Sequence, residues 1–209
     1  MLNEQAHLYF LNKMIYNIGM NRNEQKKATA LKIMTSAKEL FSEQGYDTTN
    51  TRQIAKHAGV GVGTVFSHFK DKHQLTKALF FAELEKQLTL NKATIDQGGL
   101  IFFSTQTKLL FHFYDGNRDL SKAFLQNALF ERDFFSEQLD GFILTISGLL
   151  TVDLPNHSEQ QRITLSKAWV GFYFNELLRG LSDPKSTVTT WHQTLMLQCQ
   201  QLLTMLMNK

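Results

Sequence analysis

Residues 45–75 decide the fold of this chain, and they read GYDTTNTRQIAKHAGVGVGTVFSHFKDKHQL. Asn50 is a residue type that caps helix N-termini, and Gln53, three residues later, can complete a capping box. The short helix that starts there is predicted to end at Gly59, because glycine readily takes the left-handed conformation found after a helix C-terminus.

A second short helix is predicted within residues 62–69, after a short spacer that contains Gly61. Asp71 is then expected to cap a third helix, with Gln74 in the box position. The apolar stripe of the second helix is expected to be Val65, Phe66 and Phe69. Residues 50–69 therefore form a candidate helix-turn-helix motif, a unit whose second helix enters the major groove of DNA.

The preceding segment, residues 33–46, reads IMTSAKELFSEQGY. With the stretch above, it resembles the TetR family of bacterial transcription regulators over about residues 27–87. The features that carry the resemblance are Leu40-Phe41 before Gly45-Tyr46, Ile54-Ala55, Ala58-Gly59-Val60, Gly63-Thr64 and His68-Phe69-Lys70-Asp71-Lys72. The resemblance implies a three-helix DNA-binding domain over residues 27–87 and a helical domain for effector binding and dimerisation over residues 92–209.

Composition favours an all-α protein. The chain has 209 residues, of which 43% are hydrophobic and 20% charged, enough to bury a core in one or two domains. Two prolines and 12 glycines are too few for a sandwich of many short turns, and strand-like alternation is absent.

Charge is unevenly placed along the chain. Residues 26–77 contain nine Lys or Arg and four Asp or Glu, a balance of +5, whereas residues 78–209 contain 11 and 13, a balance of −2. A basic first domain on a nearly neutral body suits a module that meets DNA phosphates through one end.

Several classes of protein find no support in the sequence. The single cysteine, Cys199, excludes an internal disulfide and a cysteine-based zinc site, and the histidines lack metal-ligand spacing. No catalytic triad, nucleotide-binding glycine loop or paired-carboxylate signature is present, so we expect no enzyme, cofactor or metal. Without a long apolar run or a signal peptide pattern, a cytoplasmic protein with no membrane partner is expected.

Residues 1–26 form an N-terminal extension with two interpretations. Apolar residues at helical spacing allow a short amphipathic helix, and they are Leu8, Leu11, Ile15 and Ile18. Alternatively, Met20 is the natural start and residues 1–19 are a start-site artefact.

The long helices are read from apolar periodicity. In the first domain, we predict a helix over residues 26–44 and a helix from Asp71 to about residue 92, followed by a break over residues 91–99. In the body, helices are predicted at 100–114, 118–135, 137–150 and 158–181, with a loop at 151–157. Asp183-Pro184 is expected to start the last helix as a cap and a first-turn proline. Eleven of the 17 phenylalanines lie in residues 100–174, where each is more often core than pocket.

The last two predicted helices carry a regular apolar stripe, which is either ordinary core or a seam facing a partner. The resemblance favours the second interpretation, since the last two helices of TetR-like proteins pair with their symmetry mates. The predicted interface residues are Trp169, Tyr173, Leu177, Val188, Trp191, Leu195, Cys199, Leu202 and Leu206. Cys199 is interpreted as a small buried hydrophobe, with a redox sensor as the alternative.

The resemblance also implies the residues that contact DNA. They are Thr51, Arg52, Gln53, Val62, Gly63, Thr64, Phe66, Ser67, His68 and Lys72. Phe66 departs from the family, which usually has a tyrosine whose hydroxyl reaches a phosphate. His68 is expected at a phosphate, with a helix-end carbonyl as the alternative partner. The second helix lacks Arg, Asn and Gln for bidentate base contacts, so specificity is expected from other side chains, methyl contacts and DNA shape.

The leading hypothesis is a homodimeric repressor that binds a near-palindromic operator and is released by a small apolar or amphipathic effector. The alternative is a DNA-tethered interaction protein of the same fold that binds no metabolite. Effector-binding residues cannot be chosen from an aromatic-rich core by sequence alone.

Overall fold

The computed structural model describes residues 24–89, 97–128 and 132–208, and within these ranges it contains nine α-helices and no β-strand. The all-α prediction is confirmed. The described residues fall into two compact units: an N-terminal unit, mainly residues 24–86 with 117–128, and a C-terminal unit, mainly residues 97–116 with 133–208. The predicted helix at residues 8–18 and the Met20 alternative lie outside the described residues.

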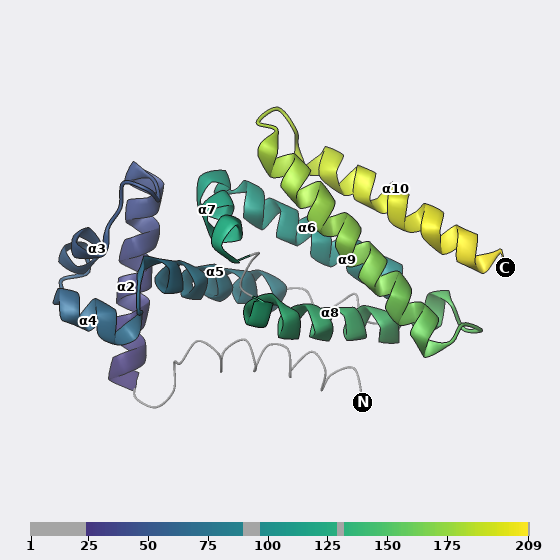
Figure 1. The fold of residues 1–209 in the computed structure, drawn as a ribbon, viewed down its shortest axis with the longest axis horizontal. Helices are drawn as coiled ribbons and strands as arrows, with labels where there is room; N and C mark the ends of the chain where they lie inside the picture. Colours follow the sequence, from purple (N-terminus) through teal and green to yellow (C-terminus); the bar gives the residue numbers. More distant parts are fainter. Residues whose placement is uncertain (1–23, 90–96, 129–131, 209) are drawn as a thin grey trace. The chain divides into compact units, whose positions relative to one another are not determined.

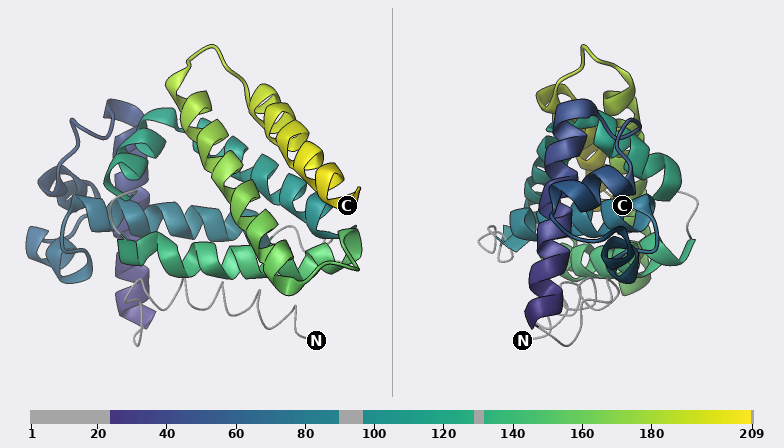
Figure 2. Two further views of the ribbon diagram at one scale, coloured as in Figure 1. Left: turned by 45° about the vertical axis from the view of Figure 1, so that its right-hand side comes forward. Right: turned by 90° about the vertical axis from the view of Figure 1, so that its left-hand side faces the viewer.

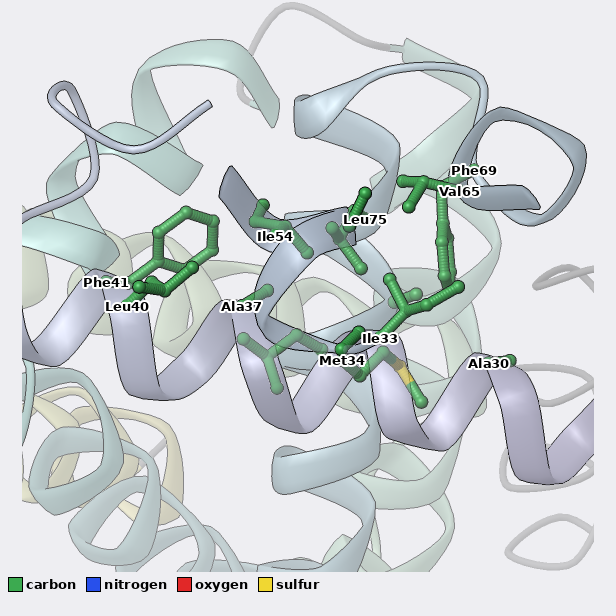
Figure 3. Packing of buried hydrophobic residues seen from close by; sticks show 14 of the residues in the cluster. Ala30, Ile33, Met34, Ala37, Leu40, Phe41, Ile54, Val65, Phe69 and Leu75 are labelled. Atoms are coloured by element: carbon green, nitrogen blue, oxygen red, sulfur yellow. The ribbon is translucent and has the colours of Figure 1, made fainter. Parts of the chain in front are cut away.

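Four consecutive helices begin the N-terminal unit: α2 (Glu24–Gln44), α3 (Thr51–His57), α4 (Val62–His68) and α5 (Lys72–Thr89). One apolar cluster joins them, as Figure 3 shows for α2 and the helices it supports. From α2 it receives Ala30, Ile33, Met34, Ala37, Leu40 and Phe41. From α3 to α5 it receives Ile54, Ala55, Ala58, Val65, Phe69, Leu75, Ala78 and Leu79.

Helix α3 begins and ends as its sequence predicts. The side chain of Asn50 accepts a hydrogen bond from the backbone N–H of Gln53 at 3.0 Å, and Gln53 Oε1 accepts one from the N–H of Asn50 at 2.8 Å. Gly59 takes a φ of 64° after the helix, and the N–H of Val60 returns to the carbonyl of Ala55 at 3.0 Å. This Schellman arrangement satisfies carbonyls at the helix end and turns the chain towards α4.

Helix α5 also starts where predicted. Asp71 Oδ1 accepts a hydrogen bond from the backbone N–H of Gln74 at 2.7 Å. The helix is described as far as Thr89, and most of the predicted break at 91–99 lies outside the described residues.

Helix α7 (Arg118–Ala128) belongs to the N-terminal unit, although it follows that unit by many residues in sequence. Phe124 stacks on Phe80 of α5 with ring centroids 4.0 Å apart, and Phe81 meets the same ring edge-on at 6.3 Å. The expected domain division at residues 87–92 therefore omits a helix that packs on α5. The predicted segment 118–135 is observed as helix to residue 128.

The C-terminal unit contains α6 (Gly99–Asp115), α8 (Arg132–Asp153), α9 (Glu159–Ser182) and α10 (Val188–Met207). Helices α9 and α10 form an antiparallel hairpin, and they lie side by side in Figures 1 and 2. Aromatic rings join the helices. The ring centroids of Phe103 in α6 and Trp169 in α9 are 5.4 Å apart. The ring centroid of Phe111 lies 5.2 Å from that of Tyr173 and 5.6 Å from that of Trp191.

The predicted start of the last helix is wrong. Asp183 ends α9 and opens a turn, in which its carbonyl accepts a hydrogen bond from the N–H of Ser186 at 3.2 Å and Oδ1 accepts one from Lys185 N–H at 2.9 Å. Helix α10 starts at Val188 instead, capped by Thr187 in a reciprocal pair with Thr190. Asp-Pro suits a turn as well as a helix start, and here the side chain of Asp183 bonds locally.

The predicted dimer seam is the core of the C-terminal unit. The buried members are Trp169, Tyr173, Leu177, Val188, Trp191, Leu195 and Cys199, while Leu202 and Leu206 are half-buried. A stripe at steps of three and four marks the face a helix buries, but the hairpin itself supplies the partner. The helices meet so closely that a Cβ on Gly180 would lie 2.1 Å from the Trp191 ring.

Candidate DNA-binding site

The recognition helix α4 divides its side chains between core and solvent. Val65 and Phe69 are buried, and Val62 packs partly against the same cluster. Phe66 is instead 49% exposed, so the predicted three-residue apolar stripe is wrong for this position. In a helix this short, positions 65 and 69 lie one turn apart on one face, and position 66 is turned away from it.

The exposed side of α4 is formed by Gly63, Phe66 and Ser67, with Thr64 and His68 half-buried beside it. Ser67 Oγ donates a hydrogen bond to the carbonyl of Thr64 at 2.8 Å, so its hydroxyl proton is used within the helix. The face that α4 offers to a groove is therefore small and largely apolar.

The first side chains of α3 differ in their exposure and in their hydrogen bonds. Arg52 is exposed and Thr51 is half-buried, and their approach to a phosphate backbone stays a prediction. Gln53, also expected at DNA, is half-buried, and its Oε1 is occupied by the capping box. Its amide nitrogen is the part that remains for a ligand.

Lys72 has an internal role that the sequence did not predict. Its Nζ donates hydrogen bonds to the carbonyls of Tyr46 at 2.9 Å and Thr49 at 3.0 Å, and it lies 3.9 Å from the centre of the Tyr46 ring. Burial lowers the pKa of Lys72, and Asp47 partly opposes this. The ammonium thus holds the turn that leads into α3, and a phosphate contact by Lys72 stays a prediction.

His68 is half-buried at the end of α4. Burial, and then the positive charge of Lys26, lower the pKa of His68. Near neutral pH the imidazole is therefore mostly uncharged, and it can offer a phosphate a hydrogen bond rather than a full positive charge.

Exposed cations surround these helices in the N-terminal unit. They are Lys26, Lys27, Lys32, Lys38, Arg52, Lys56 and Lys70. Within the described ranges, the structure has no group of three His, Cys, Asp or Glu residues placed to hold a metal ion. No helix in the same ranges is long and apolar enough to cross a membrane.

Comparison with known proteins gives the family. Residues 33–79 match the family described as bacterial regulatory proteins, tetR family. This segment is a tetR-family domain. It contains most of α2, all of α3 and α4, and the first part of α5, so the protein is a sequence-specific DNA-binding transcriptional regulator.

Sequence relatives of this regulator include two bacterial proteins. The fatty acid metabolism regulator protein of Bacillus subtilis is 27% identical over 178 residues, which cover 80% of this chain and 86% of the relative. An HTH-type transcriptional regulator of Staphylococcus aureus is 30% identical over 118 residues, covering 49% of this chain and 62% of the relative.

Solved structures share the fold over both units. A TetR regulator from Rhodococcus superposes with a TM-score of 0.66 at 17% identity, covering 86% of this chain and 97% of its own. The regulator FadR from Bacillus subtilis, solved with stearoyl-CoA, gives a TM-score of 0.60 at 20% identity, covering 81% and 96%. At such identities the likeness establishes the fold alone.

Proposed function

We propose that this regulator is a homodimeric repressor of a near-palindromic operator and that a long-chain acyl-CoA releases it from DNA. The DNA-binding half of the proposal is carried by one observation: α3 and α4 pack against each other, and each exposes side chains, in a unit with a surplus of exposed Lys and Arg. A dimer presents two such units, and its symmetry would be mirrored in the operator.

Arg52 tests the DNA-binding surface. The Arg52→Ala variant should lose operator affinity and reduce the slope of log affinity against log salt by about 1, because one phosphate contact is removed. Lys185→Ala is the matched control, an exposed cation of the C-terminal unit whose loss should change neither quantity. Equal behaviour of the two variants in a fluorescence anisotropy titration would remove Arg52 from the surface.

The effector proposal rests on two relatives and on the aromatic interior of the C-terminal unit. The Bacillus subtilis FadR structure holds stearoyl-CoA, and a Thermus thermophilus FadR structure holds lauroyl-CoA. In this chain the rings of Phe102, Phe103, Phe142 and Trp169 form a continuous apolar series, with neighbouring centroids 5.4 to 6.2 Å apart. Such an interior suits an acyl chain.

Trp169 is the residue we assign to the effector. It is fully buried, and its Nε1–H has no hydrogen-bond partner among the described residues. An unsatisfied buried donor costs about 1–3 kcal/mol. A carbonyl oxygen of an acyl thioester would satisfy it. By contrast, Trp191 Nε1 already donates to Ser186 Oγ at 2.8 Å.

Effector binding is measured by thermal unfolding and by operator release. Stearoyl-CoA should raise the unfolding temperature and dissociate the operator complex, while coenzyme A alone should do neither. The Trp169→Phe variant should bind the operator normally but need more stearoyl-CoA for release. If this variant responds like the unaltered protein, Trp169 lies outside the effector site.

The homodimer requires a different surface from the predicted seam. Helices α9 and α10 expose Leu178 (41%), Leu197 (57%) and Met205 (66%) on the sides away from the core. Gly171, midway along α9, is also exposed, and a Cβ there would meet nothing within 4 Å. Packing within the protomer does not require a glycine at position 171. The missing side chain would let a helix of the partner protomer approach α9 closely.

The Leu197→Glu variant should therefore dissociate into monomers and lose operator affinity. Leu144→Glu is the control, because Leu144 is 55% exposed on α8 and lies outside the proposed interface. Sedimentation analysis distinguishes the two. A Leu197→Glu protein that remains dimeric would place the interface elsewhere.

A further inference from the structure

We propose that α4 recognises thymine methyl groups, with the Phe66 ring in contact with them and Gly63 allowing the helix close to the bases. The inference rests on the proposed approach of the exposed α4 face to the major groove. It adds the chemistry that this face reads and the residue that determines specificity.

Gly63 is the first observation. It lies inside α4 without a positive φ, and a Cβ built on it would meet nothing within 4 Å. Glycine destabilises a helix interior relative to alanine. The free protein thus gains nothing from Gly63 in conformation or in packing. What a side chain there would obstruct lies outside the protomer, on the side that Gly63 shares with Phe66 one turn later.

Phe66 is the second observation. Half of this ring is exposed on a helix whose core positions are already filled by Val65 and Phe69. The exposed part of the ring is apolar area that a partner surface can cover, and covering it is favourable. Next to the ring, Ser67 uses its hydroxyl proton within the helix. The exposed face consequently has an apolar group at its centre.

The major groove contains one apolar group on the base edges, the C5 methyl of thymine. Guanine, adenine and cytosine present donors and acceptors that an exposed phenyl ring cannot satisfy. Contact with Phe66 would desolvate these polar edges without compensation, whereas a thymine methyl gains from being covered. We therefore expect a thymine opposite Phe66 in each half-site of the operator.

The experiment replaces thymine by deoxyuridine in a duplex that the full-length protein has selected from random-sequence DNA. Each replacement removes one methyl group and leaves base pairing and phosphates unchanged. At one or two positions per half-site, deoxyuridine should weaken binding about fourfold per methyl, the equivalent of burying one carbon group. Phe66→Ala should weaken binding to the thymine duplex and abolish the difference between thymine and deoxyuridine.

Gly63→Ala provides an independent arm. The unfolding temperature of this variant should be unchanged or slightly raised, because the added methyl group has room. Its affinity for the selected duplex should fall. Equal binding to thymine and deoxyuridine at every position would overturn the inference, as would a Phe66→Ala variant that still discriminates them. Failure to select any duplex would instead contradict the proposed function.

Discussion

Lys72 shows how a single residue can shape the DNA-binding surface from inside. Its ammonium bonds the carbonyls of residues 23 and 26 positions earlier, at the turn that precedes Asn50 and Arg52. Lysine is suited to this because one cation can satisfy two carbonyls while its stem covers the Tyr46 ring. The side chain thereby fixes where α3 begins.

Replacing Lys72 by methionine should therefore destabilise the N-terminal unit by about 1.5–3 kcal/mol, the range for hydrogen bonds to a charged group. Urea unfolding of the full-length protein measures this change. Lys70→Met, at an exposed neighbouring position, is the control and should have little effect on stability. Unchanged stability with lost operator affinity would show that Lys72 serves the phosphate instead.

Cys199 illustrates a residue whose burial decides its chemistry. The side chain is fully buried in α10, and burial raises the pKa of its thiol to about 12. Because the thiolate is the reactive form, native protein at pH 8 should not react with iodoacetamide, whereas urea-unfolded protein should. Mass spectrometry counts the modified chains. Rapid labelling of the native protein would revive the redox-sensor interpretation.

Local sequence signals predicted local features well. The Asn50–Gln53 box, the left-handed Gly59 and the Asp71 cap all involve residues a few positions apart, so the pattern alone contains the interaction. The Lys72 contacts join distant positions and leave no periodic trace in the sequence. The exposure of Phe66 was missed because adjacent apolar residues do not reveal which of them the core accommodates.

At the scale of elements, the hairpin of α9 and α10 depends on one close contact. Gly180 faces Trp191 so closely that any side chain must displace the ring, which is itself fully buried and bonded to Ser186. Overpacking of this kind cannot be relieved by a flexible side chain, because the indole ring is rigid and its surroundings are filled.

Gly180→Ala should consequently lower the free energy of unfolding by at least about 1–3 kcal/mol, the usual cost of overpacking a core. Gly63→Ala is the same substitution at a helical position with open space, and it should leave stability equal or higher. Calorimetry of both variants tests the contact. Equal melting temperatures would mean that the hairpin can separate at Gly180 without cost.

Apolar periodicity identified the elements and their buried faces, but not what each face packs against. The bounds predicted for α2, α6 and α9 agree with the structure to within two residues. The stripe on α9 and α10 was assigned to a second protomer because a monomer core and a dimer seam have the same spacing. Likewise, nothing in the sequence of α7 indicates that it joins the N-terminal unit.

At the scale of the whole molecule, the chain passes between its two units more than once. It leaves the N-terminal unit near residue 86, returns at Asn117 for α7, and leaves again near residue 132. Helices α5 and α7, joined by Phe80 and Phe124, are thus directly continuous in sequence with the C-terminal unit. In the proposed mechanism, these connections are the covalent route by which an effector in the C-terminal unit would alter the N-terminal unit.

Coupling between effector and operator must be reciprocal if both bind at equilibrium. If stearoyl-CoA lowers operator affinity by a given factor, saturating operator should lower stearoyl-CoA affinity by the same factor. A tenfold effect corresponds to about 1.4 kcal/mol. Titration calorimetry with and without operator measures the second factor. A large effect in one direction only would indicate that release occurs by a route other than two-site coupling.

The most direct test of the account is selection of genomic DNA fragments by the full-length protein in excess nonspecific competitor, with and without stearoyl-CoA. We predict enrichment of a small set of fragments that share a near-palindromic site, and loss of that enrichment with stearoyl-CoA but not with coenzyme A. Enrichment that ignores stearoyl-CoA would contradict the proposed effector and favour a DNA-tethered interaction protein. Recovery of no fragment above competitor would contradict the central claim that this protein reads a DNA sequence.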